Sequence, residues 1–144
     1  MHKQKVLFLC TGNSCRSQMA EGWGRHLHAG RFEFFSAGIE KHGLNPLAVQ
    51  VMGEAGVDIS TQYSKLLSEL DPATFDYVIT VCDHAHEQCP LFPGKAIKLH
   101  QEFPDPPRLA QDAASEEEAL SHYRSVRDAI REYLVNLPSI LASL

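Results

Sequence analysis

The chain has 144 residues, 44% of them hydrophobic and 22% charged, and a formal net charge of −5 at pH 7. This length and composition are typical of one globular domain, here residues 1–144, and they exclude a disordered or collagen-like chain. The acidic balance argues against binding of nucleic acid or anionic membranes, which needs a basic face, but it permits a local anion site built from backbone amides and one arginine.

The N-terminus begins with a short apolar run rather than a targeting or anchoring segment. This run, at residues 6–10, ends after five residues, which is short of the roughly 7–15 residues of a signal peptide's hydrophobic region. No apolar run approaches the roughly 18 residues of a membrane span. We therefore expect a monomeric cytoplasmic protein that binds neither membrane nor nucleic acid, with its four cysteines present as reduced thiols.

Strand and helix signals alternate along the first half of the chain. Continuous apolar runs predict buried parallel strands, whereas apolar residues at helical spacing predict helices. An Asn-Pro pair is typical of a helix start and a glycine of a helix end. The predicted elements are a strand at 5–9, a small polar loop at 10–17, a helix from Met19 to Gly30, a strand at 32–37 and a helix from Asn45–Pro46 to Gly56.

The second half contains two more strands, a loop and the clearest helix. Three prolines exclude regular structure from residues 101–110, which we predict to be a loop. Ser115 and Glu118 form a capping box at the start of the last helix, whose apolar stripe ends at Leu137 before Pro138. The two strands are predicted at residues 77–81 and 95–99.

This alternation of strands and helices predicts a three-layer α/β sandwich with an approximately four-stranded parallel sheet and helices on both faces. Ligands of such sheets bind beyond the carboxyl ends of the strands. Three segments should meet at that edge: the loop after Leu9, the segment after Val81 and the proline-containing loop after Leu99. We therefore expect the functional site there.

The loop after the first strand has the residues of an oxyanion site with a nucleophile. Its backbone amides and the following helix N-terminus can bind a tetrahedral anion, and Arg16 can hold two oxygens with its planar guanidinium. Gly12 and Asn13 tolerate the backbone conformations that such a loop needs. The positive field should lower the pKa of Cys10 and make it a thiolate, to which Ser17 could donate a hydrogen bond. The predicted oxyanion-binding residues are Thr11, Gly12, Asn13, Ser14, Cys15, Arg16 and Ser17.

The alternative for this loop is a buried cysteine at a strand end beside a surface arginine. The motif itself favours the functional interpretation, because a Cys-x5-Arg-Ser placed near the N-terminus, from Cys10 to Ser17, resembles the loop of the low-molecular-weight protein tyrosine phosphatase fold family. Residues 10–22 are closer still to the thioredoxin-coupled arsenate reductases built on that fold. The likeness continues through residues 36–40, 42–43 and 45–46 and extends to about residue 137.

Two further cysteines, Cys82 and Cys89, follow the third predicted strand. Thiols at this spacing can form a disulfide if a short helix between them unwinds. The residues alone leave two alternatives: a zinc site that adds His84 and His86, although the spacing matches no common zinc motif, and a pair of inert buried thiols. The resemblance implies the redox role, since arsenate reductases carry redox cysteines at these positions. Cys15 lies inside the loop but is not positioned for attack, so we expect it to be a structural residue or an accidental oxidation partner of Cys10.

Asp105 is the candidate proton donor. It lies between prolines in a loop at the predicted carboxyl edge, and removal of an oxygen from a tetrahedral oxyanion needs an acid nearby. The resemblance supports this assignment, because the family's Asp-Pro acid matches Asp105 and Pro106. The alternatives are an ordinary aspartate in a turn, and Asp83 as the acid, which no likeness supports.

The resemblance implies arsenate reduction by a three-cysteine relay. Cys10 would attack arsenate, Asp105 would protonate the departing oxygen, and Cys82 would then expel arsenite and form a Cys10–Cys82 disulfide. Cys89 would convert this to a Cys82–Cys89 disulfide that thioredoxin reduces, so that no metal or bound cofactor is needed. Phosphate and sulfate are the expected competing oxyanions. Two other functions remain open: a tyrosine phosphatase that uses Cys10, Arg16 and Asp105, and a non-catalytic oxyanion-binding redox sensor.

One position departs from the resembling family. In some relatives a potassium ion lies behind the loop, with ligands that match Asn13, Glu21 and Ser36. The fourth ligand is a carboxylate, at the position where this chain has Lys65. An ammonium is a monovalent cation with three donors, so we expect Lys65 to reach Glu21 and Asn13 in place of potassium, which would not be required. The alternative is a solvated surface lysine.

Overall fold

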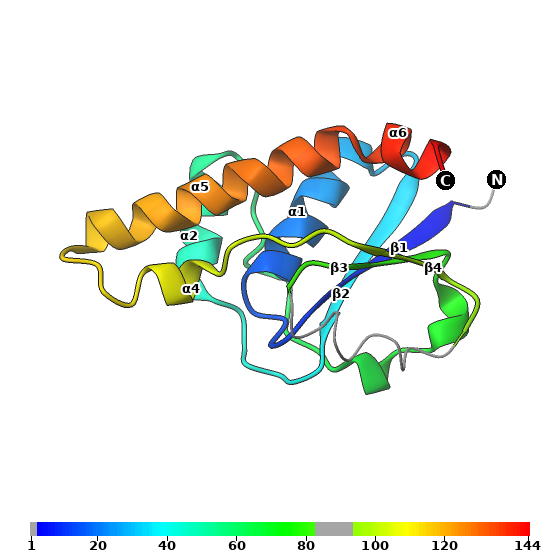
Figure 1. Cartoon of the computed structure of the whole chain (residues 1–144), viewed down its shortest axis with the longest axis horizontal. Helices are drawn as coiled ribbons and strands as arrows, with labels where there is room; N and C mark the ends of the chain where they lie inside the picture. Colours follow the sequence, from blue (N-terminus) through cyan, green and yellow to red (C-terminus); the bar gives the residue numbers. More distant parts are fainter. Residues whose placement is uncertain (1–2, 83–93) are drawn as a thin grey trace.

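A parallel sheet forms the centre of the computed structural model, which describes residues 3–82 and 94–144. Its strands are β1 (Gln4–Cys10), β2 (Phe32–Gly38), β3 (Tyr77–Thr80) and β4 (Ile97–His100). They pair in the order β2-β1-β3-β4, and every pairing is parallel. Figure 1 shows this sheet with α1 and the long helix α5 above it. The predicted α/β fold with a four-stranded parallel sheet is confirmed.

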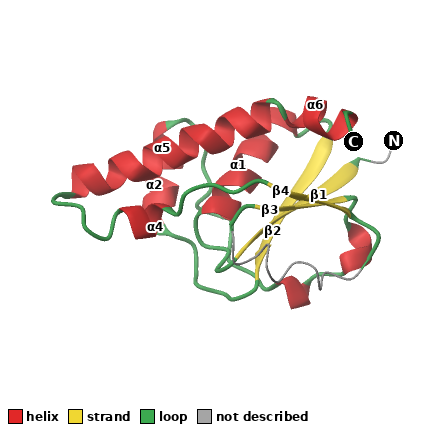
Figure 2. Ribbon diagram, viewed as in Figure 1, coloured by secondary structure: helices red, strands yellow, loops and turns green. Residues whose placement is uncertain are grey.

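Helices cover one face of the sheet as stacked layers. They are α1 (Arg16–His28), α2 (Pro46–Glu54), α4 (Pro106–Leu109), α5 (Glu116–Val135) and α6 (Leu137–Ala142). α1 packs on β1 and β2, and α5 packs on α1 and α2. The 3-10 helices η1 (Leu67–Glu69) and η2 (Pro72–Thr74) lie on the other side of the sheet in Figure 2. Within the described residues, these short helices are the helical segments on the second of the two faces that were predicted to carry helices.

β1 is the centre of the fold because its sequence suits burial on both faces. Residues 6–9 are fully buried, and β1 pairs with β2 along one edge and with β3 along the other. The buried part of a strand in this position has to be continuously apolar, as residues 6–9 are. It therefore delivers Cys10, its last residue, to the carboxyl edge of the sheet at a fixed position.

α5 has the amphipathic pattern that the sequence predicts. The Ser115 hydroxyl accepts a hydrogen bond from Glu118 N (3.1 Å), whereas the Glu118 carboxylate accepts from Ala114 N (2.8 Å) rather than from Ser115 N. The buried stripe consists of Leu120, Tyr123, Val126, Ile130 and Leu134. Across the two described ranges no helix, α5 included, has both the length and the apolarity to cross a membrane.

Two short helices correct the sequence-based assignment around the prolines. α4 lies inside the segment 101–110, which was expected to contain only loop, and α6 begins at Leu137, where the last helix was expected to end. In both cases proline occupies one of the first two helical positions. Proline is favoured there because the first amides of a helix have no intrahelical partner and its fixed φ suits the helix.

Candidate active site

A large cavity lies at the carboxyl ends of the strands, as predicted. Its volume is about 930 Å³, and it is lined by the loop after β1, by Cys82 after β3 and by the segment after β4. The lining includes Cys10, Arg16 and Asp105. The structure thus brings together the predicted nucleophile Cys10, the predicted anion-binding arginine, the second predicted relay cysteine Cys82 and the predicted acid.

The loop after β1 is held open from outside through its carbonyl groups. Four backbone hydrogen bonds fix it: Ile39 N donates to Cys10 O (3.3 Å), Glu40 N to Thr11 O (2.7 Å), His42 N to Gly12 O (3.0 Å) and Asn45 N to Ser14 O (3.0 Å). In a planar trans peptide the next N–H points opposite to each carbonyl, so these amides point away from residues 39–45. Thr11, Gly12 and Cys15, which carry three of them, line the cavity. This is the amide cradle that an oxyanion requires.

Asn13 anchors the loop from the inside. Its φ of 48° is the left-handed conformation expected of this residue. Its side chain is buried, with Nδ2 donating to Ser17 Oγ (2.9 Å) and Oδ1 accepting from Lys65 N (2.9 Å) and Gln18 Nε2 (3.1 Å). Within the described residues, the Ser17 hydroxyl is hydrogen-bonded to Asn13 and not to Cys10. The suggested bond from Ser17 to the Cys10 thiolate is therefore absent.

Arg16 connects the loop with the proline-containing segment and keeps one donor for a ligand. Its Nη1 donates to Phe103 O (2.9 Å), and its Nη2 lies 3.7 Å from Asp105 Oδ1. Arg16 Nε is buried yet has no hydrogen-bond partner among the residues that the structure describes. Since buried donors are nearly always paired, this N–H at the wall of the cavity is a donor for a bound anion.

Cys10 and Cys82 are both buried and line the same cavity, and Thr11 Oγ1 lies 3.2 Å from Cys82 Sγ. Hydrogen bonding with the Cys82 thiol is the largest cause that raises the pKa of Cys10 well above its ordinary value. Burial and the charge of Cys82 also raise this pKa, while Arg16 and the Thr11 amide lower it. The lowered pKa expected from the sequence is thus wrong for this state. The sequence showed Arg16 beside Cys10 but not a second thiol against it.

Cys15 lies in the loop but lacks the properties of a nucleophile. Burial raises the pKa of its thiol far above the ordinary value, and the nearby Arg16 opposes this shift only in part. The thiol therefore stays protonated at neutral pH. This agrees with the structural role expected of Cys15.

The remaining candidates around the second cysteine pair lie outside the described residues. These are Asp83, His84, His86 and Cys89. Within residues 3–82 and 94–144, no group of three or more His, Cys, Asp or Glu side chains could hold a metal ion. The zinc alternative for residues 82–89 is not tested by this observation.

Several residues that shape the site were missed by sequence reasoning. The His42 ring lies against Gly12, where an added Cβ would come within 2.2 Å of His42 Nδ1. Asn45 was identified only as a helix cap, yet its Nδ2 also donates to the Tyr123 hydroxyl (3.1 Å) of α5. Phe103 contributes through its carbonyl. A backbone contact of this kind leaves no signal in the sequence.

Comparisons with known proteins agree with this geometry. The model of the low molecular weight phosphotyrosine protein phosphatase family matches residues 5–143. The chain belongs to this family. A protein of Halalkalibacterium halodurans named arsenate reductase is 45% identical over 130 residues, which are 90% of this chain and 91% of that protein.

Two solved structures extend the comparison to the fold. One, of an arsenate reductase in an oxidized state, is 34% identical, covers 93% of this chain and 95% of its own, and has a TM-score of 0.78. The other, of an arsenate reductase in a phosphate-binding state, is 33% identical with the same coverage and a TM-score of 0.75. The family resemblance expected from the loop motif is therefore confirmed.

Proposed function

We propose that this protein reduces arsenate to arsenite. The observation that carries the proposal is the contact between the Cys10 and Cys82 thiols at the wall of an oxyanion-binding cavity. A phosphatase needs one nucleophilic thiol, whereas a two-electron reduction needs two thiols that can form a disulfide. The similarity to arsenate reductases over most of the chain supports the same substrate.

In the first step, a thiolate at Cys10 attacks the arsenic atom of arsenate held by the loop amides and Arg16. An S–As bond forms and an As–O bond breaks, and the departing oxygen leaves as water after Asp105 supplies a proton. Arg16 and the Thr11 amide, which lower the pKa of Cys10, favour formation of this thiolate.

In the second step, Cys82 attacks Cys10 Sγ. The S–S bond forms, the S–As bond breaks, and its electron pair remains on arsenic, which leaves as arsenite. Two thiols lose two electrons and arsenate gains two. Protein thiols thus supply all the electrons of the reaction, and the step needs no bound cofactor.

We propose that Cys89 then attacks Cys82 and that thioredoxin reduces the resulting Cys82–Cys89 disulfide by thiol–disulfide exchange. The position of Cys89 seven residues after Cys82 supports this step. A cytoplasmic location suits the relay, because thiols are kept reduced there. Phosphate and sulfate should compete with arsenate for the same cradle.

The test follows arsenate-dependent oxidation of NADPH in the presence of thioredoxin and thioredoxin reductase. Cys10→Ser should abolish it, and Cys82→Ser or Cys89→Ser should stop multiple turnovers. The second candidate function, favoured by the family match, is phosphatase activity, measured with p-nitrophenyl phosphate. Cys10→Ser should abolish this activity too, whereas Cys82→Ser should retain it. Undiminished arsenate turnover by Cys82→Ser would exclude the relay.

A further inference from the structure

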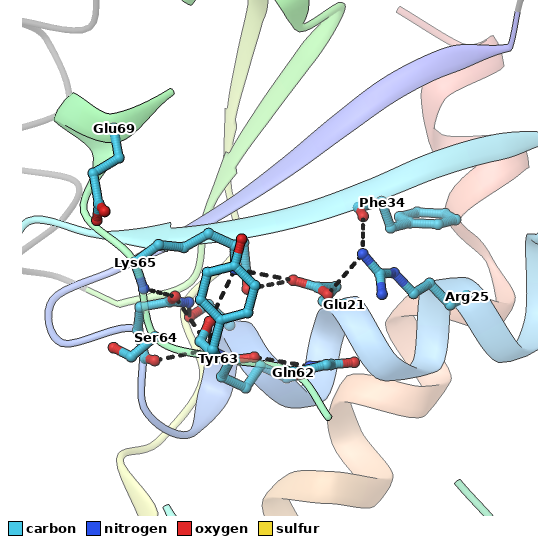
Figure 3. Close-up of polar contacts among 12 residues, drawn as sticks. Glu21, Arg25, Phe34, Gln62, Tyr63, Ser64, Lys65 and Glu69 are labelled. Carbon is cyan, nitrogen blue, oxygen red and sulfur yellow. Dashed lines mark hydrogen bonds and ion pairs between the residues drawn. The ribbon is translucent and has the colours of Figure 1, made fainter. Parts of the chain in front are cut away.

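A buried carboxylate lies directly behind the oxyanion loop. Glu21, in α1, has a side chain that is only 2% exposed. Its Oε1 accepts a hydrogen bond from Ser36 Oγ (2.6 Å), and its Oε2 lies 3.0 Å from Arg25 Nη2. Figure 3 shows this carboxylate pointing from α1 toward the segment that carries Lys65. A charge buried this deeply requires cationic partners.

Lys65 brings the second cation to this carboxylate. Its Nζ lies 3.8 Å from Glu21 Oε1 and donates to Tyr63 O (3.0 Å). The Tyr63 ring covers the ammonium, with 4.7 Å between Nζ and the ring centroid. The Lys65 side chain is only 11% exposed, so the alternative of a solvated surface lysine does not describe it.

The segment that holds Lys65 is also bonded to the loop itself. Lys65 N donates to Asn13 Oδ1 (2.9 Å), and Ser64 Oγ donates to Gly12 O (3.0 Å). Lys65 O accepts from Gly38 N (2.8 Å) at the end of β2. The expected contact between Lys65 and Asn13 therefore exists, but it is made by the backbone amide rather than by the ammonium.

We propose that Lys65 is a positioning residue whose ammonium serves as the built-in cation of the oxyanion loop. By holding Glu21 and Tyr63 O, the ammonium fixes residues 63–65 against the loop. The two bonds from Ser64 and Lys65 then hold Gly12 O and the left-handed Asn13 in the orientation that keeps the cradle open. The inference concerns the oxyanion site of the proposed function, but it does not require that the bound anion be reduced.

The same contacts oppose a potassium ion at this place. Carboxylate, carbonyl and hydroxyl oxygens are ligands for hard cations, and Glu21, Tyr63 and Ser36 present one of each. However, a metal ion bound to Glu21 would be the third cation on a single carboxylate, after Arg25 and Lys65. The residues present therefore do not fit the potassium site of the resembling proteins.

The test measures binding of inorganic phosphate by calorimetry and the midpoint of thermal unfolding, so it is independent of arsenate chemistry. The native protein should give the same affinity and the same midpoint in sodium and potassium salts at matched ionic strength. Lys65→Asp, which removes the cation and adds an oxygen ligand, should bind phosphate more weakly in sodium and recover affinity in potassium. Stronger phosphate binding by the native protein in potassium would overturn the proposal.

Three further variants separate positioning from general stability. Lys65→Met should weaken phosphate binding by roughly 10-fold or more, the usual effect of removing a residue that orients the groups in direct contact with a ligand. Lys65→Arg should restore most of the affinity. Lys41→Met, which removes a lysine from an exposed pair with Glu69, should bind as the native protein does. The proposed role would be contradicted if Lys65→Met bound phosphate with the native affinity, or if Lys41→Met lost as much affinity as Lys65→Met. If Lys65→Met does not fold, the phosphate affinity of Lys65→Arg and the comparison of the native protein in the two salts test the proposal.

Discussion

Arg16 Nη2 lies 3.7 Å from Asp105 Oδ1, so the predicted anion-binding arginine also faces the candidate acid. The same guanidinium donates to Phe103 O, two residues before Asp105. One side chain therefore holds the proline-containing segment against the oxyanion loop. An anion bound at Arg16 Nε would contact the same guanidinium that faces Asp105 through Nη2. Asp105 would therefore lie beside the anion.

Asp105→Asn should slow the arsenate step by about 10²–10⁴-fold, the usual effect of removing a general acid. The amide keeps the size of the side chain but has no transferable proton. Phosphate affinity, measured by calorimetry on the same variant, should change little, because the loop amides and Arg16 remain. An unchanged single-turnover rate with arsenate would contradict the assignment and favour Asp83 or solvent as the proton source.

Cys82→Ala should lower the pKa of Cys10. It removes the hydrogen bond and the charge that raise this pKa, and leaves Arg16 and the Thr11 amide, which lower it. The pH titration of the thiolate absorbance at about 240 nm should occur at lower pH than in the native protein. Cys15→Ala is the matched control, because the thiol of Cys15 does not ionise near neutral pH. A Cys10 titration that stays in place in Cys82→Ala would show that burial, rather than the second thiol, sets the pKa.

The sheet and the long helix could be predicted from sequence because their signals are local. The fully buried run in β1 and the buried stripe of α5 follow directly from hydrophobic periodicity. The small helices α4 and α6 were missed because proline both interrupts a helix and is favoured in the first turn of one. The presence of a proline alone therefore does not show whether a loop or a new helix follows.

The site could be predicted only where its residues share one segment or one sheet edge. The spacing of Cys10 and Arg16 indicated an oxyanion loop, and parallel topology placed Asp105 near it. The contact of Arg16 with Phe103 joins residues 87 positions apart, and no local pattern encodes it. The direction of the Cys10 pKa shift was wrong for the same reason, since it depends on Cys82 from another strand end.

Gly38→Ala should damage the oxyanion loop more than other glycine substitutions do. An added Cβ would lie 2.5 Å from Glu40 O, 2.8 Å from Asn13 N and 2.9 Å from Thr11 O, all backbone atoms that cannot rotate away. We expect a loss of about 1–3 kcal/mol in the free energy of unfolding, together with weaker phosphate binding. Gly53→Ala in α2, with no atom within 4 Å, should instead gain about 0.5–1 kcal/mol. Urea unfolding of both variants measures the difference, and equal stabilities would contradict the expected clash.

Tyr133 gives the protein a specific alkaline sensitivity. Its ring packs edge-on against Phe103, with 5.9 Å between the ring centroids, and burial raises the pKa of its hydroxyl to about 12. In the unfolded chain the pKa of tyrosine is about 10. Between these two values the folded protein keeps a proton that the unfolded chain has lost, so the free energy of unfolding should fall as the pH rises through this window. Below about pH 10 both states are protonated, and the effect is absent.

Tyr133→Phe should remove this contribution, because phenylalanine keeps the ring contact but has no proton to lose. Urea unfolding at a series of pH values between about 9 and 12 measures this contribution. The free energy of unfolding of the native protein should fall more steeply with pH than that of the variant, and the difference in slope should correspond to about one bound proton. Other groups that titrate in this range, Tyr123 among them, remain in both proteins, so their contribution cancels in the comparison. Identical slopes in the two proteins would show that Tyr133 ionises as readily in the folded protein as in the unfolded chain.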